Sequence, residues 1–270
     1  MRNIAFSVAV ALLSQSAFAT DDTVRNPLTD QGSWQELSGD IVGDKPLKDG
    51  ASLFDVDAPY RAHDAATVPI VIKKLDMSAG PIKLATLVID ENPAPVAVEM
   101  VFGKAMDPLK MEVRVRVNQY SNVRVIAETD TGSFMHGKFV KASGGCSAPA
   151  SRDPEIALIS MGIIRLKHFG EDAVMSNQRR EAQIMIRHPN YSGLQRDQIT
   201  QLFIGAHFID ELEVFQGNEL LFKMIGGISV SENPVFRFDY TDNGSTSLRV
   251  RARDTEGNVW EETLEKQAQS

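Results

Sequence analysis

Hydrophobic and polar residues alternate along most of this chain with the two-residue period of β-strands. The clearest case runs from Met111 to Val117, where valines occupy one face and charged residues the other. This pattern predicts a half-buried strand with Arg114 and Arg116 on its solvent face. Similar segments recur every ~8–12 residues with turn signals between them, which is typical of a β-sandwich. The other segments in the first half are Thr67–Ile72, Ile82–Ile89, Val96–Met100, Val123–Ala127 and Phe134–Val140.

The same alternation resumes in the second half of the chain and predicts a second sandwich. Gln216–Asn218 and Asp254–Asn258 have the composition of hairpin turns between consecutive strands. The predicted strands are Gly162–Lys167, Glu181–Ile186, Leu212–Phe215, Leu220–Met224, Val235–Tyr240, Leu248–Ala252 and Val259–Glu262.

One early segment has a helical period instead. Between Asp30 and Gly43, the residues Trp34, Leu37 and Ile41 fall on one face, which predicts a short amphipathic helix. We therefore expect an all-β chain of two immunoglobulin-like sandwich domains with a short N-terminal helix.

The segment between the two sets of strands lacks any apolar period. From Lys141 to Ser151 it reads KASGGCSAPAS, almost entirely Gly, Ser, Ala and Pro. This composition predicts a flexible linker. The expected organisation is a first sandwich with its helix at 20–140, a linker at 141–154 and a second sandwich at 155–270.

The start of the chain has the features of a secretory signal. A positive charge at Arg2 precedes a short apolar run, and Ala17-Phe18-Ala19 gives a small-residue cleavage pattern, so residues 1–19 are the predicted signal. The apolar run is too short to remain as a membrane-spanning helix. We therefore expect a periplasmic protein. Its formal net charge of −8 argues against nucleic acid or an anionic membrane as the partner.

The chain contains a single cysteine, Cys146. Exported proteins usually pair their cysteines, and this one has no partner within the chain. Gly144 and Gly145 precede it, and glycines avoid clashes in a narrow partner site and widen the range of backbone angles. We predict that Cys146 is a working thiol on an arm whose flexibility comes from Gly144 and Gly145.

Other candidate chemistry is sparse, so we expect no metal, no cofactor and no enzymatic activity. The histidines show no paired metal-ligand spacing, and one cysteine cannot build a typical structural zinc site. His188 and His207 are expected in structural or interface positions, and Asp254 in a turn. No serine triad, phosphate loop or dinucleotide fingerprint is present. The histidines are His63, His136, His168, His188 and His207.

Several motifs resemble two proteins of bacterial periplasmic sulfur oxidation. The first half resembles the carrier subunit SoxY through Val68–Val71, Val88–Pro93 and Gly144-Gly145-Cys146. The second half resembles its partner SoxZ through Arg187–Asn190, Ala206–Ile209 and Ile228–Phe238. The whole chain resembles a SoxY–SoxZ fusion, of the group called quinoprotein dehydrogenase-associated SoxYZ-like carriers.

The resemblance implies a covalent carrier. Both halves would be immunoglobulin-like sandwiches paired within one chain, and Cys146 would be the attachment point on a swinging arm. Tethering the two partners raises their effective concentration. Periplasmic enzymes would load and unload the thiol, either Sox-type enzymes acting on sulfur compounds such as thiosulfate or a quinoprotein dehydrogenase. In SoxY the cysteine is followed by a terminal Gly-Gly, whereas here the chain continues with Ser147-Ala148-Pro149.

Two other hypotheses remain open at this stage. The chain could be an accessory protein that docks on a periplasmic PQQ-dependent alcohol dehydrogenase or its cytochrome, with Cys146 incidental. Alternatively, Cys146 could act as a redox sensor or form an intermolecular disulfide. Replacing Cys146 with Ser separates the carrier from the docking protein, because only the carrier needs the thiol.

Overall fold

The computed structural model describes residues 28–30, 32–150, 154–170 and 178–266. The predicted signal at 1–19 lies outside these residues. The helices and strands, in chain order, are α1 Ser33–Val42, β1 Leu47–Asp49, β2 Phe54–Asp57, β3 Val68–Lys74, β4 Leu84–Ile89, β5 Val96–Phe102, the 3-10 helix η1 Lys104–Met106, β6 Lys110–Val115, β7 Ser121–Thr129, β8 Gly132–Val140, α2 Pro154–Ile159, β9 Ile164–Phe169, β10 Arg179–Ile186, β11 Ile209–Gln216, β12 Glu219–Gly226, β13 Val235–Thr241, β14 Ser247–Asp254 and β15 Val259–Glu265.

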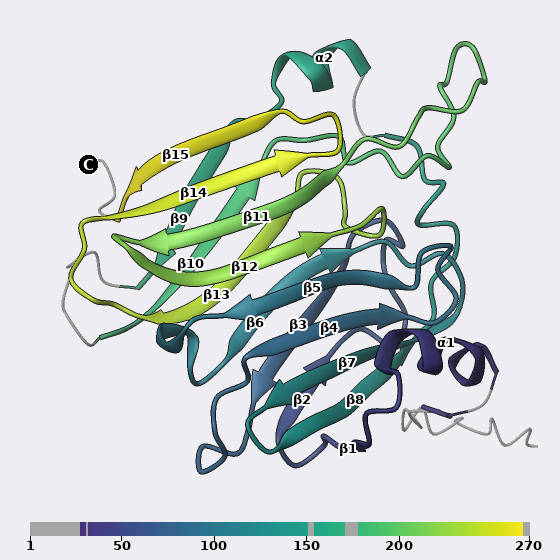
Figure 1. The fold of residues 1–270 in the computed structure, drawn as a ribbon. Helices are drawn as coiled ribbons and strands as arrows, with labels where there is room; N and C mark the ends of the chain where they lie inside the picture. Colours follow the sequence, from purple (N-terminus) through teal and green to yellow (C-terminus); the bar gives the residue numbers. More distant parts are fainter. Residues whose placement is uncertain (1–27, 31, 151–153, 171–177, 267–270) are drawn as a thin grey trace, which may run out of the picture.

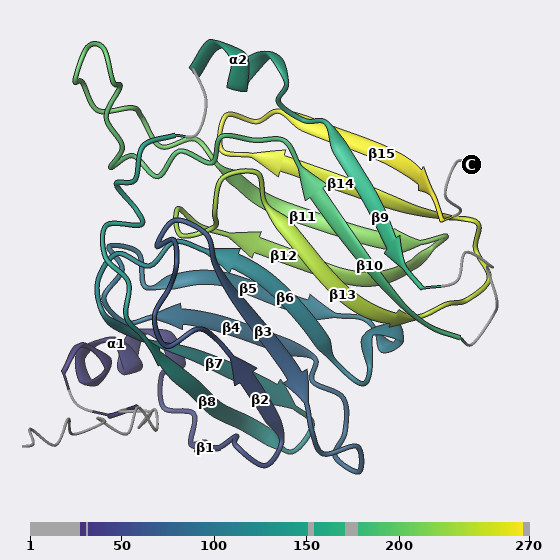
Figure 2. The same cartoon turned by 180° about the vertical axis from the view of Figure 1, so that it is seen from behind.

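The strands form two sheets that face each other. The larger sheet has the order β1-β8-β7-β4-β5-β12-β11-β14-β15 and lies in front in Figure 1. The smaller sheet has the order β2-β3-β6-β13-β10-β9 and lies in front in Figure 2. The mostly β, two-layered fold predicted from the alternation is confirmed, with a β-sandwich in each half of the chain.

The two sandwiches are joined edge to edge. In the larger sheet β5 pairs antiparallel with β12, and in the smaller sheet β6 pairs antiparallel with β13. The register places Phe102 opposite Phe222 and Val113 opposite Phe236. One hydrophobic cluster contains buried side chains from both halves. The halves therefore share both sheets and one continuous core.

Helix α1 lies on the outer face of the larger sheet, as its pattern predicts (Figure 1). Trp34 is buried against Val88 of β4 and Ile126 of β7, and the Arg124 guanidinium lies 4.4 Å from the Trp34 ring centroid. Within the described residues, neither α-helix has the length and apolarity that crossing a membrane requires.

The predicted strands are all present, and β1, β2 and α2 are additional. One assignment is wrong: Arg116 is not on a solvent face. Strand β6 ends at Val115, and Arg116 follows it with only 1% of its surface exposed, whereas Arg114 is exposed. The alternation fails because the chain leaves the strand between these two arginines.

Candidate functional site

Cys146 lies in a compact turn at the junction of the two halves. This turn belongs to the connection between β8 and α2, at the right-hand end of the sandwich in Figure 1. The Cys146 side chain is fully buried. The composition of the segment predicted a flexible arm, but in this structure it is packed. Small residues permit close packing as readily as they permit flexibility, and composition alone does not distinguish the two.

The glycines before the cysteine are held by the first half of the chain. Gly144 N–H donates to the carbonyl of Asn118 at 2.8 Å, and Gly145 N–H donates to the carbonyl of Val117 at 3.1 Å. Gly144 adopts φ +77°, which favours glycine. A Cβ on Gly145 would lie 2.1 Å from the carbonyl oxygen of Ala65, so only glycine fits this contact.

Residues from the second half hold the cysteine and the chain after it. The Ser192 hydroxyl donates a hydrogen bond to the carbonyl oxygen of Cys146. The Gln195 side-chain amide donates to the carbonyl oxygen of Ala148 at 2.9 Å. The turn that bears Cys146 is therefore closed by side chains from the other sandwich.

The Arg116 guanidinium lies against the same turn. Its Nη1 donates to the carbonyl of Gly145 at 3.2 Å, and its Nη2 donates to the carbonyl of Asn190 at 3.3 Å. Burial raises the pKa of the Cys146 thiol to about 11, although the positive charge of Arg116 acts in the opposite direction. Because the desolvation effect is larger, the buried thiol is neutral near pH 7 and is a poor nucleophile in this conformation.

Motifs distant in sequence meet around this turn. Asn92 donates to the carbonyl of Arg116 at 2.7 Å and to the Ser229 hydroxyl at 2.9 Å. The Ser231 hydroxyl donates to the carbonyl of Ala66 at 2.7 Å. The side chain of Asn190 donates to the carbonyl of Val230 and accepts from the N–H of Ile209. These bonds fix the walls of the cysteine site from both sandwiches.

Behind Asn190, the structure groups His188, His207 and Asp254. Asp254 Oδ2 lies 2.7 Å from His207 Nε2 and 3.4 Å from His188 Nε2. Burial and the neighbouring His207 lower the pKa of His188 to about 4. Burial would raise the pKa of Asp254, but hydrogen bonds from Asn258 and the two histidines outweigh it and lower that pKa to about 2. A neutral His188 thus lies beside an ionised Asp254 near neutral pH.

Two imidazoles and a carboxylate within 4.8 Å of one another are a possible metal-ligand set. The hydrogen bonds around His188 oppose this use. Its Nδ1 accepts the backbone N–H of Asn190 at 3.0 Å, so the proton of the neutral ring resides on Nε2. That nitrogen then donates toward Asp254 and has no lone pair for a metal. The cluster is better described as a hydrogen-bonded support for the 188–190 segment.

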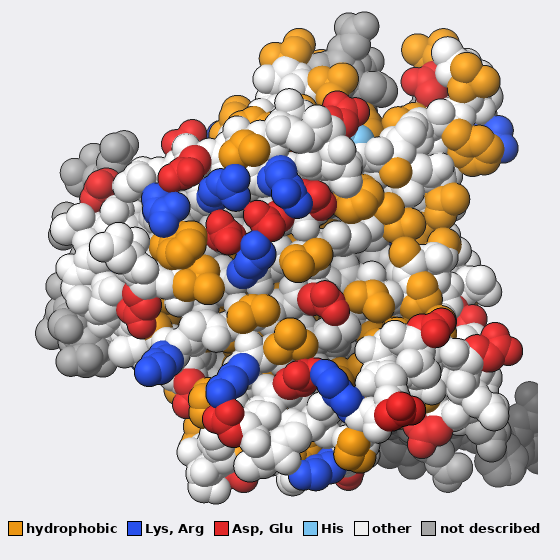
Figure 3. All heavy atoms as spheres, viewed as in Figure 1, with side chains coloured by type: hydrophobic (Ala, Val, Ile, Leu, Met, Phe, Trp, Pro, Cys, Tyr) orange, Lys and Arg blue, Asp and Glu red, His pale blue; other side chains and the backbone are white. Residues whose placement is uncertain are grey.

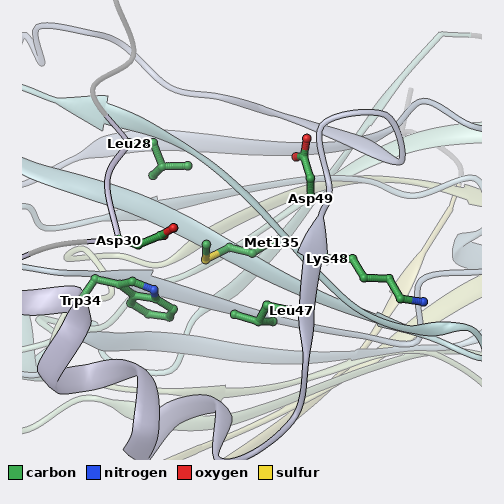
Figure 4. Close-up of a pocket in the computed structure, with 7 residues that line it drawn as sticks. All are labelled: Leu28, Asp30, Trp34, Leu47, Lys48, Asp49 and Met135. Atoms are coloured by element: carbon green, nitrogen blue, oxygen red, sulfur yellow. The ribbon is translucent and has the colours of Figure 1, made fainter.

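A separate pocket of about 430 Å³ lies between α1 and the edge strand β1 (Figure 4). Its lining combines Asp30, Lys48 and Asp49 with the apolar side chains of Trp34 and Met135. None of the lining residues belongs to the Cys146 turn. This pocket is therefore not part of the cysteine site.

Part of the outer surface of the larger sheet, over β11, β12 and β14, carries ion pairs. Blue and red side chains gather over β14, β11 and β12 in Figure 3. Arg251 of β14 and Lys223 of β12 both form ion pairs with Glu211 of β11. The loop that begins at Ser192 differs, because it projects from the sandwich (Figure 1) and contains the exposed apolar residues Ile199, Leu202 and Phe203. The base of this loop is the part that contacts the cysteine turn.

Comparison with known families matches two different families to the two halves of the chain. The family described as Sulfur oxidation protein SoxY matches residues 39–146, and the family described as Sulphur oxidation protein SoxZ matches residues 169–265. The chain is a SoxY–SoxZ fusion. No curated protein matches it. The solved structure of the sulfur carrier protein SoxY from Chlorobium limicola f thiosulfatophilum is 17% identical, with a TM-score of 0.34, and covers 40% of this chain and 94% of that chain.

In this SoxY–SoxZ fusion, the SoxY match ends at Cys146, and the residues that close the cysteine turn come from the SoxZ domain. Sequence reasoning singled out Gly144, Gly145 and Cys146, and the structure places them together in one packed turn. Reasoning from the sequence did not identify Arg116 or Ser192 as site residues. The burial of an arginine just after a strand leaves no signal in a single sequence. The contact that a serine makes from the base of a loop leaves none either.

Proposed function

We propose that this chain is a periplasmic carrier that holds an intermediate covalently on the Cys146 sulfur and presents it to partner enzymes. The observation that carries the proposal is that the only cysteine of the chain ends the SoxY match and is enclosed by residues of both domains. The partner enzymes supply the chemistry, and the carrier supplies the thiol and its enclosure.

The buried position of the thiol requires an opening step in this proposal. Opening breaks the hydrogen bonds of Gly144, Gly145, Ser192 and Gln195, each worth ~0.5–1.5 kcal/mol. In water the thiol regains an ordinary pKa near 8.5 and forms more thiolate, the reactive species. The closed turn protects the thiol, and the open turn presents it.

The cargo is a sulfur compound, as in sulfur oxidation, or an intermediate linked to quinoprotein dehydrogenase metabolism. Family membership favours the sulfur compound, because both matched families are sulfur-oxidation proteins. Sox-type enzymes are then the partners that load and unload Cys146. If the cargo is instead an intermediate linked to quinoprotein dehydrogenase metabolism, a quinoprotein dehydrogenase would load and unload Cys146.

The decisive experiment compares the wild-type chain with Cys146→Ser in the native host. Intact-mass analysis of the purified wild-type protein should show an adduct that maps to Cys146 and is removed by thiol reductant. The Cys146→Ser protein should melt at the same temperature, carry no adduct and fail to support substrate oxidation. Full function of Cys146→Ser would instead favour an accessory protein that docks on a periplasmic PQQ-dependent alcohol dehydrogenase or its cytochrome.

A further inference from the structure

Arg116 is a buried cation whose immediate partners are uncharged. Its Nη1 and Nη2 atoms donate hydrogen bonds to the carbonyl oxygens of Gly145 and Asn190. The Nε atom is buried and has no hydrogen-bond partner among the described residues. Asp64 and Glu232 act on it electrostatically, but the described residues place no carboxylate within ion-pair distance. Burial of a charge without a direct counter-ion is unfavourable.

A group attached to the cysteine sulfur can change the electrostatic environment of the buried Arg116 charge. The Arg116 charge interacts with the charge of a Cys146 thiolate, and this interaction is the strongest of those that favour charged Arg116. The free thiol is neutral in the closed turn, because burial raises its pKa to about 11. An attached anion, by contrast, keeps its charge at neutral pH. It would give Arg116 the counter-ion that the free thiol does not provide.

The surface beside the turn also carries positively charged side chains. A pocket of about 390 Å³ is lined by Arg61, His63, Tyr120 and Lys141, and no carboxylate is among its described lining residues. The same pocket includes Ser143, three residues before Cys146, and Ala65, whose carbonyl meets Gly145. Cations are therefore present both beneath the turn and next to it.

We infer that Arg116 is a specificity-determining residue of the carrier, which stabilises the closed turn when the Cys146 sulfur bears an anionic group and disfavours neutral groups of equal size. This inference rests on the proposed carrier function and assigns the charge of its cargo. Arg116 does not act on the reacting bond. It determines which adducts the protein encloses after loading.

Two alkylating reagents of nearly identical shape test the inference on the purified full chain. The Cys146 thiolate displaces iodide from iodoacetate to give a carboxymethyl group, which is anionic, and from iodoacetamide to give a carbamidomethyl group, which is neutral. Each adduct is made in denaturant, refolded and verified by intact mass. We expect the carboxymethyl protein to melt at least about 2 °C above the carbamidomethyl protein.

Variants assign this difference to Arg116. Arg116→Gln should abolish the melting difference between the two adducts, and Arg116→Lys should retain part of it. Arg114→Gln is the matched control, because it removes the same charge from an exposed side chain nearby and should leave the difference intact. If Arg116 only stabilised the fold, replacing it would lower the melting temperatures of both adducts equally.

Equal melting temperatures of the two wild-type adducts would overturn the inference, even if Arg116→Gln failed to fold. Persistence of the difference in Arg116→Gln would overturn it as well. Neither result bears on the carrier proposal, which depends on the adduct and on the Cys146→Ser experiment in the native host. Conversely, a functional Cys146→Ser protein would refute the carrier while leaving the measured effect of Arg116 unchanged.

Discussion

The hydroxyl of Ser192 in the SoxZ domain donates a hydrogen bond to the carbonyl oxygen of Cys146 in the SoxY domain. Both residues are buried. The partner domain therefore does more than stabilise its neighbour, because it directly closes the turn that bears the thiol. Because both residues belong to one covalent chain, this contact can re-form if it breaks.

Removal of this hydrogen bond should increase thiol accessibility. A typical hydrogen bond contributes ~1 kcal/mol, so Ser192→Ala is expected to raise the open population, and hence the rate of maleimide labelling of the native protein, by roughly fivefold. The control is Ser78→Ala, because Ser78 lies in an exposed turn and its hydroxyl donates to the carboxylate of Asp76 two residues away. An unchanged labelling rate in Ser192→Ala would show that this contact does not limit opening.

Gly145 provides a steric test of the closed turn. In Gly145→Ala, the new methyl group would lie 2.1 Å from the carbonyl oxygen of Ala65 and 2.7 Å from that of Val117, both backbone atoms. We expect the turn to stay open and the thiol to react at nearly the rate of the unfolded chain, while the sandwiches remain folded. Gly80→Ala, where the added carbon meets nothing within 4 Å, should label like the wild type. Slow labelling of Gly145→Ala would contradict the observed packing.

The pH dependence of stability should report the buried thiol. Its pKa is raised to about 11 in the folded protein, against ~8.5 in the unfolded chain. Between these values the unfolded state has lost its proton and the folded state has not, so stability falls as pH rises, by at most ~1.4 kcal/mol per pH unit. Below about pH 8 the thiol contributes no pH dependence. Denaturant titrations at pH 7, 9 and 10 check this. The free energy of unfolding of the wild type should fall relative to that of Cys146→Ala at pH 9 and 10, compared with their difference at pH 7.

The sequence predicts the strands well because most of them are exposed on one face and therefore alternate. It misses β1 because three residues, Leu47–Asp49, are too few to show a period, and their partner β8 is more than 80 residues away. It also does not reveal that β5 and β12 join the sandwiches. An edge that pairs with another domain has the same local pattern as one that pairs within its own domain.

The site is predictable only in part for a related reason. The count of cysteines and the glycines before Cys146 identify the thiol from the sequence alone. The sequence pattern predicts a solvent-exposed Arg116, because the alternation of β6 continues past the end of the strand at Val115. Its burial depends on Asn92 and Asn190, which lie 24 and 74 residues away along the chain. Contacts of this kind arise from tertiary structure and leave no local pattern.

The continuous core predicts that the two domains unfold together. The chain contains two tryptophans, with Trp34 on the SoxY side and Trp260 on the SoxZ side, so each domain has its own fluorescent reporter. In Trp34→Phe and Trp260→Phe proteins, the remaining tryptophan should report the same denaturant midpoint. Well-separated midpoints would mean that the joined sheets do not couple the domains.

Phe236 offers a sharper test of the same coupling. It is fully buried at the β6–β13 junction and packs against Phe222, with ring centroids 6.1 Å apart. Phe236→Ala should cost ~3–5 kcal/mol and shift the transitions of both tryptophans, because the cavity lies in a core that both domains share. Val101→Ala lies at the other junction but is exposed, so it should change stability by less than ~0.5 kcal/mol. If Phe236→Ala shifted the unfolding transition reported by Trp260 but not the one reported by Trp34, the SoxZ domain alone would be destabilised. The shared sheets would then not couple the stabilities of the two domains.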